Sequence, residues 1–343
     1  MMYNRNKSSR GQRIRKLLAR RETHLIVLFL LVLGYAGATS PYFFTSTNIF
    51  NLSSGVVESA MVAVPLALIV MAGEIDISVG PMLALSGAVF GALIVVGAPL
   101  LLAIGGAVAT GLLGGLINGL VVIKLGLPSL VVTLGTYALY GGLAYVILGP
   151  VAVSSFPASF IDFTQGYIPD TPIPLTYIPL ATLVLIAAFA LHFTRFGRWV
   201  YFVGRNAEAA RLAGVRVGRL KIWLFIIAGG VSAFAGVMLA GRLSSARADN
   251  GSGFVLDILT IVLLGGIAIT GGEGTILGLV LATAIVATLR NAMTLANVDP
   301  NVQTTLIGLL LILSVAAPYS QRLLRDRHQR QRAKMLATAQ EES

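Results

Sequence analysis

Ten apolar runs, each long enough to cross a lipid bilayer, follow one another through most of this chain. A transmembrane helix needs about 15–25 mostly apolar residues, and a helix satisfies its own backbone hydrogen bonds in lipid. Only 11% of the 343 residues are charged, against about 25% in soluble domains. The sequence therefore predicts an all-α integral membrane protein with about ten transmembrane helices. The runs cover residues 25–39, 56–73, 79–96, 100–123, 129–148, 178–193, 222–240, 254–270, 276–295 and 302–317.

The basic residues predict the orientation of these helices, because cytoplasmic loops are enriched in Lys and Arg. Eight of the 25 basic residues precede the first run, seven lie in 195–221 and six in 322–334. With the N-terminus inside, ten spans place 22 of the 25, including Lys124, on the cytoplasmic side together with both termini. Arg242 and Arg247 break this rule, with Asp249 and Asp257 nearby.

The same pattern predicts three parts of the chain. These are a basic cytoplasmic tail at 1–24, a membrane domain at 25–317 with a cytoplasmic loop at 194–221, and a second basic tail at 318–343. The net charge is +11, and anionic lipid headgroups beside the membrane are sufficient partners for it. We therefore expect membrane lipid as a partner and no nucleic acid.

A shift of 173 positions reveals a weak internal repeat. Eight residues coincide over about sixty positions, among them Asp76 with Asp249 and Asn118 with Asn291. The shift maps the third to fifth runs onto the eighth to tenth, and a displacement by five spans would invert one copy in the membrane. Inverted repeats are common in transporters and place the pathway near the repeat interface. We therefore predict an inverted repeat of spans 3–5 and 8–10.

Two carboxylates in the stretch "MAGEIDISVGP" stand between two apolar runs, where charge is costly. Asp76 precedes a predicted helix, so capping that helix and lining a pathway are both open readings. Glu74 has no such capping explanation. Neutral hydrogen-bonding side chains elsewhere suit a neutral hydroxylated solute that has to be released. The predicted pathway residues are Glu74, Asp76, Ser78, Asn118, Thr133, Asp249 and Asn291.

The cytoplasmic loop contains the stretch "GRNAEAARLAG", residues 204–214. Asn206 can cap a short helix and Gly214 can end it. Its alanines leave one side of the helix almost without side chains, so it can seat in a cleft of another protein. The predicted contact residues for a partner are Gly204, Asn206, Glu208, Ala209, Ala210 and Gly214.

Four ordered motifs resemble one transporter family. "EAARLAG" is similar to the coupling-helix signature of ABC importer permeases, and "GEIDISVGPMLALSG", "LGLPSLVVTLGT" and "LLGGIAITGGEGTILG" resemble segments of their ribose-type branch. Glu74 departs from that pattern, which has Gly there. "AGEID", "YVILG" and "FTQGY" are most similar to rhamnose-type permeases, and "RLSSARAD" to autoinducer-2-type permeases.

The resemblance implies a permease subunit of an ATP-driven importer in the bacterial inner membrane. Its implied partners are a cytoplasmic ATP-binding subunit, a periplasmic or lipid-anchored solute-binding protein, and a second copy or paralogue of the permease. Its implied substrate is a monosaccharide such as ribose or rhamnose, or autoinducer-2.

The chain lacks the motifs of an enzyme. No lysine follows a glycine, so the phosphate-binding signature Gly-x-x-x-x-Gly-Lys is absent, and no His-Glu-x-x-His zinc motif occurs. We expect no catalytic residue, metal or cofactor, and ATP hydrolysis by another subunit. The alternative is an ion-coupled secondary transporter that uses Glu74 and Asp76 as its ion site.

Overall fold

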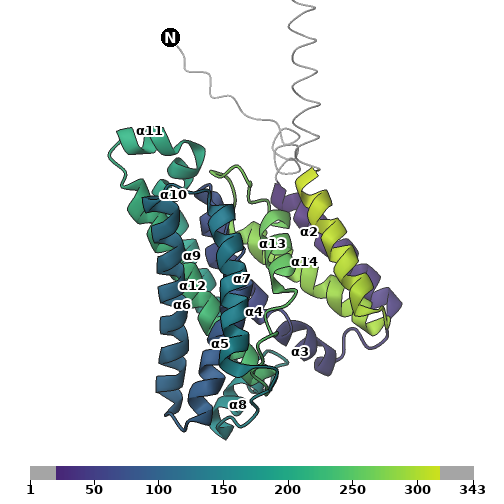
Figure 1. The fold of residues 1–343 in the computed structure, drawn as a ribbon. Coiled ribbons are helices and arrows are strands. Elements are labelled where there is room, and N and C mark those ends of the chain that lie inside the picture. Colours follow the sequence, from purple (N-terminus) through teal and green to yellow (C-terminus); the bar gives the residue numbers. More distant parts are fainter. Residues whose placement is uncertain (1–20, 317–343) are drawn as a thin grey trace, which may run out of the picture.

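The computed structural model describes residues 21–316, and the regular secondary structure in this range is helical apart from two isolated β-bridges (Figure 1). The predicted tails therefore lie largely outside the described residues. The helices are α2 (Arg21–Thr39), α3 (Ser46–Ser54), α4 (Val57–Met71), α5 (Val79–Val95), α6 (Leu100–Lys124), α7 (Ser129–Leu148), α8 (Ala158–Gln165), α9 (Tyr177–Phe193), α10 (Arg195–Arg205), α11 (Ala207–Leu212), α12 (Val217–Arg242), α13 (Phe254–Leu264) and α14 (Ile276–Leu295), followed by the helix Pro300–Ala316.

Each of the ten predicted runs overlaps a helix in this range, although the run 254–270 extends past α13, which ends at Leu264. Six helices are long and apolar enough to span a membrane, and the bent pair α9 and α10 makes up to seven. Three further apolar helices are shorter: α5, α13 and Pro300–Ala316. The class of an all-α membrane protein with several spans is thus confirmed, while the count of ten spans and the orientation of the termini stay predictions.

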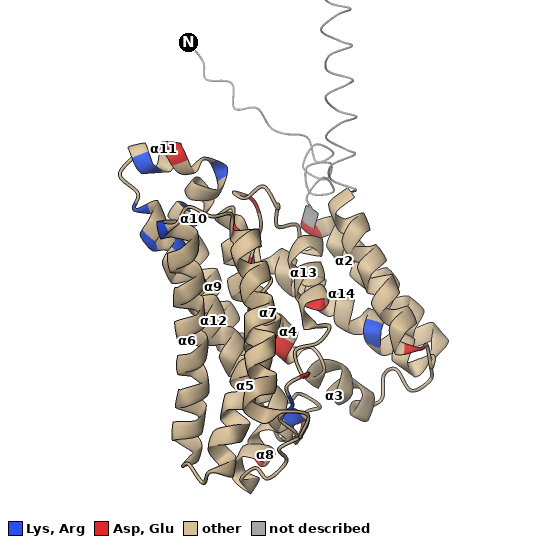
Figure 2. Cartoon of the chain, in the orientation of Figure 1, with Lys and Arg blue, Asp and Glu red and all other residues tan. Residues whose placement is uncertain are grey.

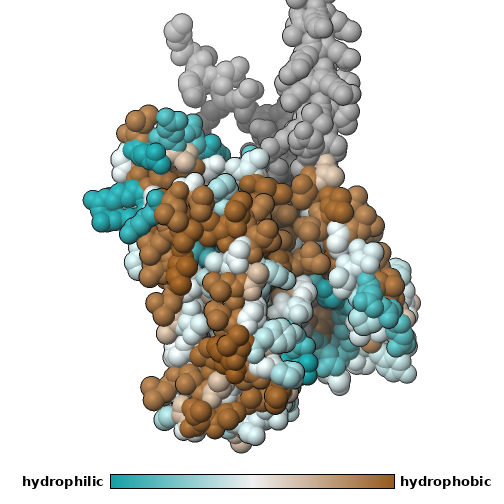
Figure 3. Space-filling model, viewed as in Figure 1, coloured by the Kyte–Doolittle hydropathy of each residue, from teal (hydrophilic) through white to brown (hydrophobic). Residues whose placement is uncertain are grey.

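The helix α4 forms the centre of the molecule. The span that contains it is 94% buried, whereas that of α2 is 11% buried. An apolar residue stands at nearly every position of α4, which is typical of a helix surrounded by other helices. In Figure 1, α6 and α12 lie on one side of α4, and α2 and α14 on the other. The exposed apolar side chains of the outer helices are suited to lipid (Figure 3).

Glycines let the two longest helices, α6 and α12, approach closely. A Cβ atom on Gly111 would lie 2.3 Å from the carbonyl oxygen of Gly229, and one on Gly115 would lie 2.2 Å from that of Phe225. Small residues at such crossings give van der Waals contact in lipid, where no hydrophobic force drives helices together. Packing therefore explains these glycines of the motif "GLLGGLINGL".

The helix boundaries fit the predicted repeat. The shift of 173 positions carries Val79, the first residue of α5, to Ser252, two residues before α13 begins. It carries the starts of α6 and α7 to within three residues of the starts of α14 and Pro300–Ala316. The starts of α5 and α13 also touch, because a Cβ atom on Gly251 would lie 2.5 Å from the carbonyl oxygen of Gly80. The start of α5 and the loop before α13 thus lie against each other. The inverted repeat itself stays a prediction.

The three arginines that lie apart from the predicted cytoplasmic clusters each have a carboxylate partner. Figure 2 shows few charged residues along the long helices. Arg247 pairs with Asp249, and Arg290 pairs with Asp257. Arg242 pairs at 2.8 Å with Glu58 at the start of α4, rather than with either nearby aspartate. These pairs offset the charge of the residues that depart from the basic-inside pattern.

Candidate functional site

The loop between α4 and α5 carries a buried polar network around Asp76. Its Oδ1 accepts hydrogen bonds from the backbone N–H of Ser78 at 2.9 Å and from the Ser78 hydroxyl at 2.6 Å. Asn118 of α6 donates its amide to the Ser78 hydroxyl at 2.8 Å. The Ser78 N–H belongs to the turn in which α5 begins, so Asp76 satisfies a helix-terminal donor. This geometry favours the capping reading of Asp76.

The helix α7 is hydrogen-bonded to the same loop. The Ser129 hydroxyl accepts from the backbone N–H of Ile75 at 3.0 Å, and the Thr133 hydroxyl donates to the Ile75 carbonyl at 3.4 Å. Tyr140 donates to the side-chain oxygen of Asn118 at 3.3 Å and to the carbonyl of Gly114 at 2.9 Å. Four of the predicted pathway residues thus come together, namely Asp76, Ser78, Asn118 and Thr133. All four are buried.

Glu74 lies apart from this network. Its carboxylate pairs with the ammonium group of Lys221 near the start of α12, and only 15% and 12% of the two side chains are exposed. Lys221 was not among the predicted site residues. A buried carboxylate needs a partner, so the basic cluster at 195–221 is the signal that could have identified it.

Asn291 lies in a different part of the fold, in α14. It exchanges two amide hydrogen bonds with Asn48 of α3, at 2.8 and 2.9 Å. Beside this pair is a cavity of about 230 Å³, whose lining includes Asp257 and Arg290. Figure 3 shows hydrophilic residues beside a hollow in this region. Both charges fall inside apolar runs, a signal for a functional site that the sequence interpretation did not use.

Asp249 is also separate from the other predicted pathway residues. It lies in the loop 243–253 before α13, where Arg247 donates to both of its oxygens at 2.8 and 2.9 Å. The side chains are 49% and 40% exposed. The hydrogen bonds from Arg247 lower the pKa of the Asp249 carboxyl below its ordinary value of 3.8. The shift of 173 positions pairs Asp76 with Asp249, but Asp76 is buried and Asp249 is partly exposed.

The loop 194–221, predicted to be cytoplasmic, contains two short helices. The helix α10 bends by 74° from α9 and buries Gly197, Val200 and Val203 on one side. Trp199 and Phe202 are exposed on it, an arrangement suited to the membrane interface.

The end of α10 meets the end of α4 and the loop between α13 and α14. A Cβ atom on Gly204 would lie 1.8 Å from the carbonyl oxygen of Met71 and 2.4 Å from the backbone nitrogen of Gly272. The latter nitrogen donates to the Met71 carbonyl at 2.8 Å. Backbones of α10, of the end of α4 and of the α13–α14 loop are thus in direct contact at Gly204.

The short helix predicted at 206–213 is confirmed as α11. Asn206 caps it by accepting from the Ala209 N–H at 2.9 Å, and Gly214 follows with a φ of +83°. Ala210 is buried, while Glu208 and Leu212 are exposed, the latter by 86%. The helix lies at one end of the molecule, above the long helices in Figure 1.

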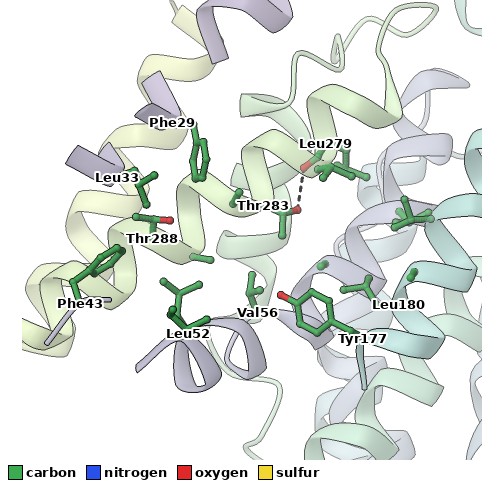
Figure 4. A pocket seen from close by; sticks show the side chains of 18 of the residues that line it. Phe29, Leu33, Phe43, Leu52, Val56, Tyr177, Leu180, Leu279, Thr283 and Thr288 are labelled. Atoms are coloured by element: carbon green, nitrogen blue, oxygen red, sulfur yellow. Dashed lines mark hydrogen bonds between the residues drawn. The ribbon is translucent and has the colours of Figure 1, made fainter. Parts of the chain in front are cut away.

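A larger cavity of about 510 Å³ lies among α2, α3, α4, α9 and α14 (Figure 4). Its wall is almost entirely apolar, and the Thr283 hydroxyl in it already donates to the carbonyl of Leu279 at 2.9 Å. A sugar needs several convergent hydrogen-bonding groups. This cavity does not provide them.

Comparisons with known proteins agree with the motifs. Residues 48–315 match the family model described as branched-chain amino acid transport system / permease component. The chain belongs to this family. The permease is 33% identical over 300 residues to the autoinducer 2 import system permease protein of Yersinia enterocolitica, covering 86% of this chain and 90% of that protein. It is 31% identical over 296 residues to the ribose import permease protein of Escherichia coli, covering 86% and 92%. No solved structure matches it.

The matched region of the permease contains the Asp76 network, the Glu74–Lys221 pair and the helices α10 and α11. As a permease component it is a transport subunit without an ATPase site of its own, and it is a multi-pass protein of the inner membrane.

Proposed function

We propose that the permease forms the transmembrane path of an ATP-driven importer for a monosaccharide or a related hydroxylated ligand. Relatives named for ribose import and for autoinducer 2 import support this substrate class. The motifs "AGEID", "YVILG" and "FTQGY" keep a rhamnose-like sugar among the candidates. In such a system a solute-binding protein outside the membrane delivers the ligand, and an ATP-binding subunit inside supplies the energy.

The observation that carries this proposal is the position of α11. The helix is exposed, capped at both ends, and joined through α10 to the contact of Gly204 with Met71 and Gly272. A subunit that binds α11 through Glu208 and Leu212 would move α10. Because the backbone of α10 is in direct contact with Met71 and Gly272, this movement would be passed to the membrane domain. The remaining predicted contact residues, Asn206, Ala209, Ala210 and Gly214, shape α11 and its ends.

Polar groups of the membrane domain would guide the solute. The Asp76 network holds the start of α5 next to the start of α13, at the interface of the proposed repeat copies. The cavity beside Asn291, with its paired Asp257 and Arg290, offers donors and acceptors without net charge. A neutral polar wall suits a neutral sugar, since weak binding permits release.

A second copy or paralogue of the permease would complete the path by packing on α7. Leu130, Val131 and Leu134 are exposed on this helix, by 49%, 61% and 60%. Nothing lies within 4 Å of a Cβ atom placed on Gly135, Gly141 or Gly142. Glycines with open space allow close approach of a partner helix in lipid.

The ion-coupled alternative fits the site less well. Lys221 neutralises Glu74, and Ser78 donates two hydrogen bonds to Oδ1 of Asp76. In the described residues no group of three or more His, Cys, Asp or Glu side chains could hold a metal ion.

Uptake by proteoliposomes tests the function. The permease is reconstituted with its ATP-binding subunit and solute-binding protein, and uptake of radiolabelled ribose, rhamnose and autoinducer 2 is measured with and without ATP. We expect uptake of one of them that requires ATP and resists an uncoupler. Uptake driven by an ion gradient without the ATP-binding subunit would overturn the proposal.

Glu208→Lys tests the role of α11. The reversal of charge on an exposed side chain should leave insertion intact and reduce ATP-dependent uptake at least tenfold. Arg198→Glu, an exposed reversal on α10, is the matched control. Normal uptake by a well-inserted Glu208→Lys variant would remove α11 from the mechanism.

A further inference from the structure

Both tryptophans of the chain line one groove between α10 and the start of α12. The groove has a volume of about 540 Å³, and its wall also includes Arg216, Arg219 and Ile227. Trp199 and Trp223 are 44% and 60% exposed. No acidic residue lines it. The groove is therefore positive and aromatic at one end.

The wall changes from charged to apolar along α12. Arg219, Trp223 and Ile227 follow at spacings of four residues in α12, so they share one side of the helix, and Arg216 directly precedes the helix. At 1.5 Å per residue the series from Arg219 to Ile227 extends about 12 Å along the helix axis. Its occupant must accordingly have a negatively charged head and an apolar body.

The two arginines are available for a ligand. Within residues 21–316, neither guanidinium takes part in a hydrogen bond or an ion pair, and both side chains are exposed. Tryptophan favours the boundary between headgroups and hydrocarbon, which places the charged end of the groove at headgroup level. A basic pocket between membrane helices at this level is suited to anionic lipid.

We propose that this groove binds an anionic glycerophospholipid. The phosphate lies against Arg216 and Arg219, the glycerol region lies between the two indoles, and an acyl chain follows α12 past Ile227. A soluble protein partner suits the groove less well, because Ile227 lies well inside the apolar part of α12. The bound lipid would join α10 to α12 beside Gly214, and so would support the position of α11.

Tryptophan fluorescence tests the proposal directly, because the chain has only these two tryptophans. The full-length permease is reconstituted in phosphatidylcholine, and dibrominated phosphatidylglycerol or dibrominated phosphatidylcholine is added in rising amounts. Bromine quenches indoles that it contacts. We expect phosphatidylglycerol to quench at a several-fold lower mole fraction, with a preference of about fivefold from each arginine.

Two matched double variants separate the groove from general attraction of the basic loop. Arg216→Gln with Arg219→Gln should abolish the preference, whereas Arg195→Gln with Arg198→Gln removes the same charge outside the groove and should retain it. Equal quenching by both lipids, or equal loss in both double variants, would overturn the proposal. So would loss of lipid quenching on addition of the ATP-binding subunit, since the groove would then be a protein interface.

Discussion

The ammonium group of Lys221 pairs with the carboxylate of Glu74, across 147 positions of sequence. The pair joins the loop that carries the Asp76 network to the start of α12, seven residues after Gly214, which follows α11. The contact ties the proposed coupling loop to the proposed pathway.

Exchanging the charges of Glu74 and Lys221, singly and together, tests whether the two side chains interact. Glu74→Lys and Lys221→Glu each leave two like charges mostly buried, and loss of one partner of a buried pair costs roughly 3–5 kcal/mol. The double exchange restores an ion pair and should recover most of the free energy of unfolding, measured in mixed micelles. Additive losses in the double variant would show that the two residues do not interact.

The role of Asp76 can be tested with two variants, one that keeps a hydrogen-bond acceptor at this position and one that removes it. Asp76→Asn keeps an oxygen that accepts from Ser78, whereas Asp76→Ala leaves buried donors without a partner, at about 1–3 kcal/mol each. If Asp76 caps α5, the Asn variant should transport at near the normal rate and the Ala variant should lose most uptake. Equal loss in both variants at matched expression would mean that transport needs an ionised carboxylate.

Gly204→Ala tests the contact of α10 with the end of α4 and with the loop between α13 and α14. The added methyl group would lie 1.8 Å from the Met71 carbonyl oxygen, so backbones must move apart, and overpacking costs about 1–3 kcal/mol. We expect a lower melting temperature and a larger loss of ATP-dependent uptake than of ATP hydrolysis by the complex. Gly105→Ala, with nothing within 4 Å of its Cβ, is the control and should behave as the parent protein does.

The pair of Arg247 and Asp249 should stabilise the loop before α13 in a pH-dependent way. Because the folded pKa of Asp249 lies below 3.8, its contribution is present above that pH and is lost as the pH falls through the folded pKa. The parent protein should melt above Asp249→Asn at pH 6, and the difference should shrink below pH 3.8. A difference that stays constant over this range would exclude the ionic contribution.

The sequence by itself determined the membrane class, the positions of the apolar helices and the short helix α11. These follow from local rules: runs of apolar residues have to form helices in lipid, and Asn206 and Gly214 mark helix ends wherever they occur. The motifs also determined the family. Of the predicted repeat, the sequence showed only that eight residues coincide after a shift of 173 positions.

Only the tertiary structure decided how the predicted pathway residues divide. It gathers Asp76, Ser78, Asn118 and Thr133, pairs Glu74 with Lys221, and places Asn291 and Asp249 elsewhere. A buried charge requires a partner of opposite charge, but the sequence contains many such residues and does not show which of them lies close by. Which one is reached depends on helix crossings set by close backbone contact, as at Gly111 and Gly229, between segments more than a hundred residues apart.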